Sequence, residues 1–155
     1  GLLDKALDVS GAMLAGKSIQ VERRYKADRP QILGLTRNLI EAFINLIANA
    51  CQAMEGGGRL TIGTVADLEE RHRERLRALG VLPANYLMTW IADTGCGIPE
   101  DHRDRVFRRF FTTKTDGTGL GLAAAQRLVK KNLGHIHSES VVGQGTVFFV
   151  YLPKA

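Results

Sequence analysis

The chain has 155 residues, of which 45% are hydrophobic, and it carries a formal net charge of +5 at pH 7. This length suits one well-packed domain and is too short for two of ordinary size, so we expect a single domain over residues 1–155. No apolar run approaches the length of a membrane span and no signal-peptide pattern opens the sequence. We therefore expect a cytoplasmic domain that makes no membrane contact.

The two cysteines, Cys51 and Cys96, lie in quite different settings. They indicate neither a disulfide framework nor a metal-ligand spacing, which also favours a reducing compartment. The positive charge suits an anionic ligand, although it would equally suit nucleic acid or an acidic partner. Because the basic residues show no nucleic-acid fold signature and no aromatic platform, we expect no nucleic-acid partner.

The first part of the chain predicts two helices and two strands. Apolar spacing predicts a helix over residues 2–14 that ends at Gly16, and alternation predicts a half-exposed strand at 18–25. A long helix is expected at 35–54. A glycine-rich connector then leads to a second strand at 59–65.

Nearly every position of the helix predicted at 35–54 is apolar, which is typical of a buried helix. The exceptions are spaced by three or four residues and fall in one stripe along a single face. They are Asn38, Glu41, Asn45, Asn49 and Gln52. A buried amide without a partner costs about 1–3 kcal/mol, so the stripe should face a polar cavity, a bound ion or ordered water. A solvent-facing stripe on an ordinary amphipathic helix would explain the same pattern.

The segment at residues 67–79 is dense in charge and predicts a helix with recognisable ends. Asp67 is placed to cap the first turn, Glu70 lies three residues on, and Gly80 follows the last leucine. Its other side chains include a narrow stripe that could dock on a neighbour. The stripe consists of Leu68, His72, Leu76 and Leu79.

Two further strands are apolar on both faces. In residues 86–92 and 146–152, apolar side chains occupy both the odd and the even positions. One face should meet the helices, and the other must be covered or sticky. We expect the helix at 67–79 or a partner domain to cover this second face.

Two glycine-rich turns suggest the two ends of one nucleotide site. Asp93 ends a strand, where its carboxylate can accept a hydrogen bond from an exocyclic amine, and Gly95 and Gly97 let the backbone turn sharply against a flat ring. The glycine run at 117–122 then leads into a helical segment ending at Lys131. Unpaired amides and the positive end of that helix would face phosphate groups.

These motifs, in this order, resemble the boxes of sensor histidine kinases. Glu-Ala-Phe-Ile-Asn-Leu-Ile-Ala-Asn-Ala at residues 41–50 resembles the N box, and Asp-Thr-Gly-Cys-Gly-Ile-Pro at 93–99 resembles the first glycine box. Phe-Arg-Arg-Phe-Phe-Thr-Thr-Lys at 107–114 is similar to the F box, and Gly-Thr-Gly-Leu-Gly-Leu at 117–122 to the second glycine box. Residues 143–153 resemble the closing strand. The Phe-Phe-Thr-Thr-Lys run and the short lid look most like the nitrogen-sensing subgroup.

The resemblance covers essentially the whole chain and implies the ATP-binding catalytic domain of a histidine kinase. The implied fold is α+β, a two-layer α/β sandwich whose mixed, mostly antiparallel sheet is covered on one face by helices (a Bergerat-type ATP-binding fold, shared with gyrase, heat-shock chaperone and mismatch-repair ATPases). Residues 67–80 would be a helical insertion, because the family pattern does not require them.

The implied reaction transfers the γ-phosphoryl group of ATP, with Mg²⁺, to a histidine on a separate dimerisation domain of the same full-length kinase. A response regulator would be an indirect partner, and the isolated domain is expected to be a monomer.

The resemblance also assigns roles within the site. Asn49 would bind Mg²⁺ through its carbonyl oxygen, a hard donor, and Asn45 would face the same cavity one turn earlier. Lys114 would meet the terminal phosphate, since Gln52 stands where many histidine kinases carry Lys or Arg. The full set of implied nucleotide contacts is Asn45, Asn49, Gln52, Asp93, Gly95, Gly97, Ile98, Thr113, Lys114, Gly117, Thr118, Gly119, Leu120, Gly121, Leu122 and Thr146.

Three other activities fit parts of the same pattern. In the hydrolytic relatives a glutamate that activates water stands at the position of Asn45, and an amide cannot serve as that base. This difference favours a kinase over an ATPase, and Glu41 is the acid to test if hydrolysis occurs. A nucleotide-binding module without phosphotransfer would leave a histidine domain unlabelled by ATP. A serine kinase of the anti-sigma type would give an acid-stable phosphoprotein.

The histidines of the chain do not match the phosphoacceptor. The acceptor motif pairs its histidine with an acidic residue and, a few residues later, a proline, whereas no proline follows His72 until Pro83. We therefore expect His72 to be a solvated helix residue. His135 and His137 alternate along a strand with no third ligand nearby, so we expect surface or structural residues rather than metal ligands.

Overall fold

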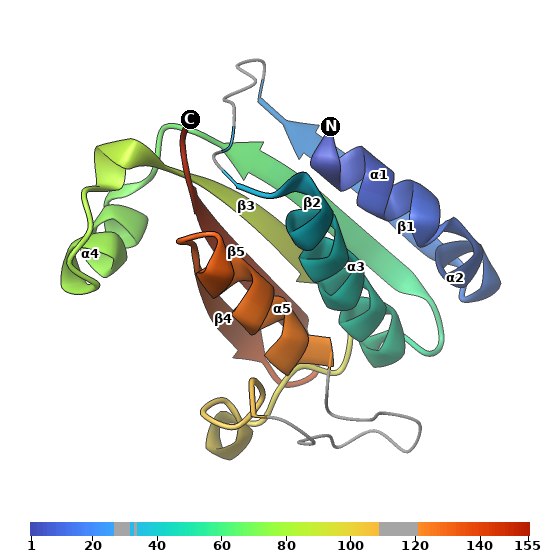
Figure 1. Ribbon diagram of the computed structural model, residues 1–155. Helices are drawn as coiled ribbons and strands as arrows, with labels where there is room; N and C mark the ends of the chain where they lie inside the picture. Colours follow the sequence, from blue (N-terminus) through green and yellow to red (C-terminus); the bar gives the residue numbers. More distant parts are fainter. Residues whose placement is uncertain (27–31, 33, 109–120) are drawn as a thin grey trace.

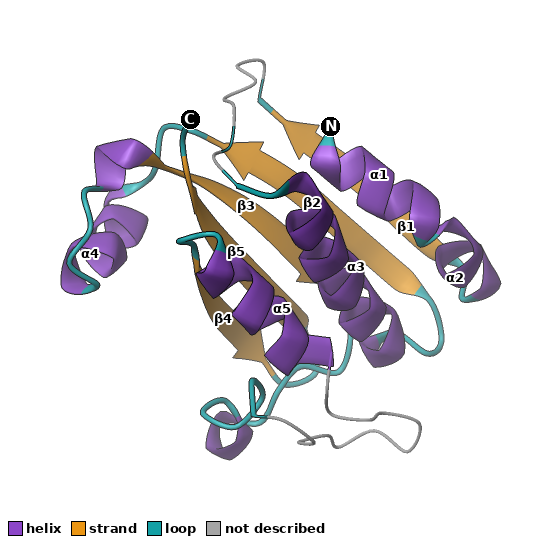
Figure 2. Cartoon of the chain, viewed as in Figure 1, coloured by secondary structure: helices purple, strands orange, loops and turns teal. Residues whose placement is uncertain are grey.

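The structure is a computed structural model that describes residues 1–26, 32, 34–108 and 121–155. Figures 1 and 2 show a layer of helices packed on a twisted sheet. In chain order the elements are α1 (Leu2–Val9), α2 (Gly11–Gly16), β1 (Ile19–Tyr25), α3 (Thr36–Ala53), β2 (Gly58–Val65), α4 (Glu70–Ala78), the 3-10 turn η1 (Pro83–Asn85), β3 (Tyr86–Asp93), the 3-10 turn η2 (Glu100–His102), α5 (Gly121–Lys131), β4 (His135–Val141) and β5 (Gly145–Pro153).

The strands form one five-stranded sheet in the order β1-β2-β3-β5-β4. β1 and β2 run parallel, and the other neighbouring pairs run antiparallel. Helices α1, α3 and α5 lie over one face of this sheet (Figure 1). The predicted two-layer α+β fold with a mixed, mostly antiparallel sheet is confirmed.

Helix α3 occupies the middle of the helical layer. Its apolar side chains recur every three or four residues, so they share one face and pack into the main core. The buried ones are Leu39, Ala42, Phe43, Leu46, Ile47, Ala50 and Cys51. Helix α5 lies beside α3 and runs in the opposite direction (Figure 1). The beginning of α5 therefore lies next to the C-terminal half of α3.

The single helix predicted over residues 2–14 is wrong, because the chain forms two helices, α1 and α2, with a break at Ser10. Ser10 has φ −86° and ψ 0°, a conformation outside the regular helix. Serine and the glycine that follows it, Gly11, are weak helix formers. The chain can bend at this point and still bury Leu7 and Leu14.

The second face of the sheet is covered by α4 and the segment that precedes it. A separate apolar cluster forms there from β2, β3, β5 and the α4 segment. Its buried members are Val65, Leu68, Leu76, Tyr86, Met88, Phe149 and Tyr151. The expectation that the helix at 67–79 covers this face is therefore confirmed. Its origin as an insertion stays a prediction.

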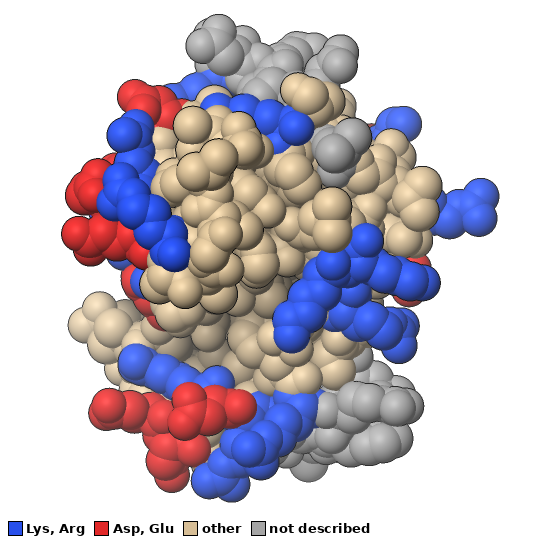
Figure 3. Space-filling model, turned by 60° about the vertical axis from the view of Figure 1, so that its left-hand side comes forward, with Lys and Arg blue, Asp and Glu red and all other residues tan. Residues whose placement is uncertain are grey.

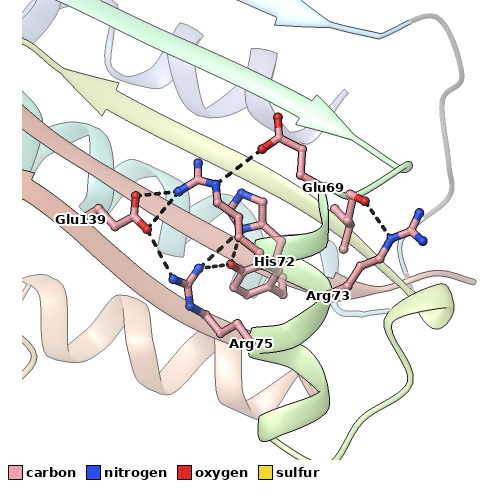
Figure 4. A network of polar contacts seen from close by, with 8 residues as sticks. Glu69, His72, Arg73, Arg75 and Glu139 are labelled. Carbon is pink, nitrogen blue, oxygen red and sulfur yellow. Dashed lines mark hydrogen bonds and ion pairs between the residues drawn. The ribbon is translucent and has the colours of Figure 1, made fainter.

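Polar contacts fix α4 to the sheet (Figure 4). His72 Nδ1 lies 2.7 Å from the hydroxyl oxygen of Tyr151, and Arg75 donates a hydrogen bond of 2.8 Å to the same oxygen. The guanidinium of Arg71 donates to both carboxylate oxygens of Glu139 on β4, at 3.0 and 3.1 Å. It also lies 5.3 Å from the ring centre of Phe149, within range of a cation–π contact.

Three expectations for this segment are corrected. Asp67 does not cap the helix, which begins at Glu70; its carboxylate accepts a hydrogen bond of 2.8 Å from Arg73 instead. His72 is only 2% exposed rather than solvated, because Tyr151 offers its ring a polar partner on the sheet. Leu79, which was expected to dock, is 50% exposed, since α4 ends one residue before it.

On the face of the molecule shown in Figure 3, basic and acidic side chains lie beside one another along the left and lower edges. The ion pairs of α4 include Arg71–Glu139 and Arg77–Glu70.

None of the helices in the described ranges combines the length and the apolar character that crossing a bilayer requires.

Candidate functional site

The polar stripe of α3 lies at the edge of the main core. Its three asparagines, Asn38, Asn45 and Asn49, are half-buried, whereas Glu41 and Gln52 are exposed. The stripe therefore borders solvent without being fully solvated. Asn45 and Asn49 lie one turn apart, on the half of α3 that runs beside α5 (Figure 1).

Asp93 is the last residue of β3 and is 7% exposed. Its Oδ1 atom accepts hydrogen bonds from the backbone amides of Gly95, at 2.9 Å, and of Thr146 on β5, at 3.2 Å. Two amide donors therefore orient the carboxylate without any ligand. The predicted position of Asp93, where a strand enters a turn, is confirmed.

The turn after Asp93 is packed tightly against two other elements. The amide of Cys96 donates to the carbonyl oxygen of Ala53 at the end of α3, at 3.2 Å, and the carbonyl oxygen of Cys96 accepts from Gly143 at 2.9 Å. A Cβ atom at Gly95 would lie 2.6 Å from the carbonyl oxygen of Ala53. Gly97 has φ +76°, a conformation that favours glycine.

The thiol of Cys51, in the last turn of α3, is influenced by its burial and by two nearby charges. Burial raises the pKa of Cys51, nearby Lys17 lowers it, and the negative charge of Asp93 raises it. Lys17 Nζ also donates to the carbonyl oxygen of Cys51, at 3.3 Å. The carboxylate therefore lies within electrostatic reach of the end of the helix that carries Asn49.

The beginning of α5 lies at the same end of the molecule as the Asp93 turn and the C-terminal end of α3 (Figure 1). Gly121 and Leu122 open this helix and are half-buried. The remaining predicted phosphate contacts lie outside the described residues. They are Thr113, Lys114, Gly117, Thr118, Gly119 and Leu120.

Ser140, a buried residue of β4 whose hydroxyl contacts this region, was not predicted from the sequence. Its Oγ atom accepts a hydrogen bond of 2.7 Å from the amide of Ile98 and lies 2.8 Å from Oγ1 of Thr146. One signal was present in the sequence. Residues 143–145 predict a tight turn, and a hairpin around it would pair the position of Ser140 with Thr146, as the structure does.

The family model named "Histidine kinase-, DNA gyrase B-, and HSP90-like ATPase" matches residues 34–155, so the chain belongs to this family. Within the family it is an ATP-binding catalytic domain of the sensor histidine kinase type, which it matches in both sequence and structure. The resemblance inferred from the sequence motifs is thus confirmed.

Three comparisons illustrate the likeness. The chain is 37% identical to the sensory histidine kinase/phosphatase NtrB of Azospirillum brasilense over 143 residues, which cover 88% of the chain and 34% of NtrB. The mycobacterial sensor histidine kinase MprB superposes with a TM-score of 0.79 at 25% identity, covering 99% of this chain and 92% of that structure. Full-length ShkA in complex with AMPPNP gives a TM-score of 0.75 at 28% identity, covering 100% of this chain and 30% of ShkA.

The chain spans less than half the length of the curated relatives that it matches, between 15% and 42% of the first five.

Proposed function

We propose that this domain binds ATP·Mg²⁺ and transfers its γ-phosphoryl group to a histidine on a separate dimerisation domain of the full-length kinase. The observation that carries the proposal is the Asp93 carboxylate, oriented by the amides of Gly95 and Thr146 at the end of the molecule where α3 ends and α5 begins. The bound AMPPNP of the related ShkA supports the choice of nucleotide.

The Asp93 turn would hold the adenine. The carboxylate is a suitable acceptor for the exocyclic amine, and its two amide partners fix its direction. Gly95 and Gly97 let this turn pack closely against Ala53 and Val141, where a Cβ atom would clash, and Ile98 is half-buried beside them. Thr146 would complete this end, since its amide is already bound to Asp93.

The N-terminal end of α5 would hold the phosphates. Backbone amides in the first turn of a helix lack partners within the helix, and the helix dipole favours an anion there. Gly121 and Leu122 stand in that turn, and we assign the preceding glycine run and Thr118 to the same task. Lys114 would neutralise the terminal phosphate, and we assign Thr113 to the nucleotide contacts.

The middle of the α3 stripe would hold Mg²⁺. The side-chain oxygen of Asn49 is a ligand that this cation accepts, and Mg²⁺ bound to phosphates keeps several waters and needs only one or two protein ligands. Asn49 is half-buried, so part of the residue remains exposed to solvent. When bound, the cation would neutralise charge on the phosphate oxygens, while Asn45 and Gln52 would contact the nucleotide from the same helix.

Phosphotransfer is favoured over hydrolysis because the stripe lacks a base at its centre. Asn45 cannot remove a proton from water. Glu41 is the one acid on the stripe, and it is exposed and a turn further from Asn49. Phosphoryl transfer relies mainly on positioning and charge neutralisation, which these residues can supply.

The proposal extends to partners. We assign the dimerisation domain as the direct partner and a response regulator as the indirect one, and we expect the isolated domain to be monomeric and to work in the cytoplasm.

Labelled ATP tests the reaction directly. The domain is mixed with the histidine-containing domain of its own kinase, and acid-labile label on histidine is the expected result. Steady-state phosphate release without any labelled protein would indicate an ATPase. Binding of ATP with neither outcome would leave a nucleotide-binding module.

A further inference from the structure

The hydroxyl of Ser140 connects three segments around Asp93. Ser140 is 7% exposed near the end of β4, and its Oγ atom accepts a hydrogen bond of 2.7 Å from the amide of Ile98. The same hydroxyl donates to the carbonyl oxygen of Gly145, at 3.0 Å, and lies 2.8 Å from Oγ1 of Thr146. The backbone carbonyl of Ser140 accepts a further bond from the guanidinium of Arg103.

The available donors and acceptors determine which group donates in each of these hydrogen bonds. A serine hydroxyl has one hydrogen to donate and two lone pairs that accept. The carbonyl of Gly145 can only accept, so it takes the hydrogen of Ser140. Thr146 must then donate its own hydrogen to Ser140, and the amide of Ile98 uses the second lone pair. The hydroxyl of Thr146 is thereby left with only lone pairs to offer a ligand.

This arrangement places two acceptors side by side. Thr146 is the residue whose backbone amide binds the carboxylate of Asp93. The carboxylate of Asp93 and the hydroxyl of Thr146, whose hydrogen is already donated to Ser140, both favour a hydrogen-bond donor such as the exocyclic amine of adenine. They disfavour guanine, which carries a carbonyl oxygen at that position of the ring.

We propose that Ser140 is a positioning residue for purine choice, holding the turn at Ile98 in place and fixing Thr146 as an acceptor beside Asp93. The inference rests on the proposed function, because it requires a purine at this end of the site. It adds a residue that contacts the base only through its neighbours and that contributes to the preference for ATP over GTP.

The test compares Ser140→Ala with Ser138→Ala by calorimetric titration with ATP and with GTP in the presence of Mg²⁺. Ser138 lies two residues earlier on β4 and on the same face of the sheet, it is half-buried, and it pairs with Phe148 rather than Thr146. Ser140→Ala should weaken ATP binding about tenfold and GTP binding less, because a buried amide and a hydroxyl lose their partner. Ser138→Ala should match the wild type in both affinities.

The preference for ATP over GTP separates positioning from a general loss of structure. Ser140→Thr keeps the hydroxyl and should keep the wild-type preference for ATP over GTP. Thr146→Val should reduce that preference, and it can be measured even if Ser140→Ala fails to fold. Equal losses of affinity for both nucleotides in Ser140→Ala, or an unchanged preference for ATP over GTP in Thr146→Val, would overturn the inference but not the proposed function of the domain. A wild-type domain that ignores ATP would remove the proposed function as well.

Discussion

The backbone amide of Thr146 donates a hydrogen bond of 3.2 Å to Oδ1 of Asp93, across the neighbouring strands β3 and β5. The same oxygen accepts from Gly95 at 2.9 Å. The end of one strand, the turn that follows it and the start of the last strand are thus held together by a single carboxylate oxygen. Asp93 has a structural task in addition to the one we propose for it in binding.

These two tasks can be separated by substitution. Asp93→Asn keeps an oxygen that can accept from both amides, so the free energy of unfolding should change little, while the charged acceptor for adenine is lost. We expect ATP affinity to fall by at least about tenfold, since hydrogen bonds to charged groups contribute about 1.5–3 kcal/mol. Titration calorimetry and a urea melt measure the two quantities.

Asp93→Ala is the companion variant. It leaves the amides of Gly95 and Thr146 without this partner, at a cost of about 1–3 kcal/mol for each buried group. We expect both stability and ATP binding to fall. Undiminished ATP binding by Asp93→Asn would show that the base lies elsewhere.

Gly95 tests whether the turn must lie close to α3. A methyl group at this position would meet the carbonyl oxygen of Ala53 at 2.6 Å, so Gly95→Ala must displace the turn. We expect weaker ATP binding and a loss of stability of about 1–3 kcal/mol, typical of overpacking. Gly56→Ala is the matched control, because nothing lies within 4 Å of its added methyl. Equal behaviour of the two variants would contradict the close contact.

Much of this fold could be predicted from the sequence because its signals are local. The apolar face of α3 repeats every three or four residues, and the two-sided apolar pattern of β3 and β5 required helices on one face and a second cover on the other. Asp93 followed by two glycines predicted a strand that ends in a turn. Each signal lies within one segment of the chain.

The misses depend on contacts between distant segments. His72 is buried because Tyr151 lies opposite it, 79 positions later in the sequence. Ser140 is important because β4 and β5 bring it to Thr146 and Ile98. The break at Ser10 and the loss of the Asp67 cap reflect choices between nearly equal local conformations, which packing decides. No pattern within a single segment predicts the contact of His72 with Tyr151 or that of Ser140 with Ile98.

Helix α4 should contribute to stability through Leu76. This side chain is fully buried in the cluster on the second face of the sheet, whereas Leu79 is 50% exposed just beyond the same helix. Leu76→Ala should cost about 2–5 kcal/mol, as is usual for a buried leucine, and Leu79→Ala should cost under about 0.5 kcal/mol. Chemical unfolding followed by the fluorescence of Trp90, which packs against this cluster, measures both. Similar losses in the two variants would contradict the docking of α4.

Acidification should destabilise the domain through His72. Burial, followed by the charges of Arg71 and Arg75, lowers the pKa of His72 below its ordinary value of 6.5, although Glu69 and Glu139 oppose this. The unfolded chain therefore takes up the proton first as the pH falls. The contribution of His72 is fully present above about pH 6.5 and is lost progressively below it, towards the lower pKa of the folded state.

The variant His72→Gln isolates this effect, because the glutamine oxygen can still accept from Tyr151. Urea melts between about pH 5 and 8 should show a smaller fall in stability on acidification than in the wild type. Some fall should persist, since burial also lowers the pKa values of His135 and His137. An unchanged dependence on pH would show that His72 does not contribute.

The proposed Mg²⁺ site predicts that Asn49 contributes to ATP affinity only when Mg²⁺ is present. Asn49→Ala should bind ATP without Mg²⁺ as well as the wild type does, and it should lose most of the additional affinity that Mg²⁺ provides. The reason is that Asn49 would contact the cation and not the base. Asn38→Ala, on the same half-buried stripe but three turns away, is the control and should retain the effect of Mg²⁺.

Thermal unfolding of the wild-type domain with and without nucleotide tests most directly whether the three segments form one purine triphosphate pocket. At a concentration a hundred times Kd, a ligand adds about 2.7 kcal/mol of stability, or roughly 5–10 °C in Tm for a chain of this size. We predict a shift of this order for ATP, larger with Mg²⁺ than without it, and absent in Asp93→Ala. An unchanged Tm at millimolar ATP and Mg²⁺ would contradict the pocket.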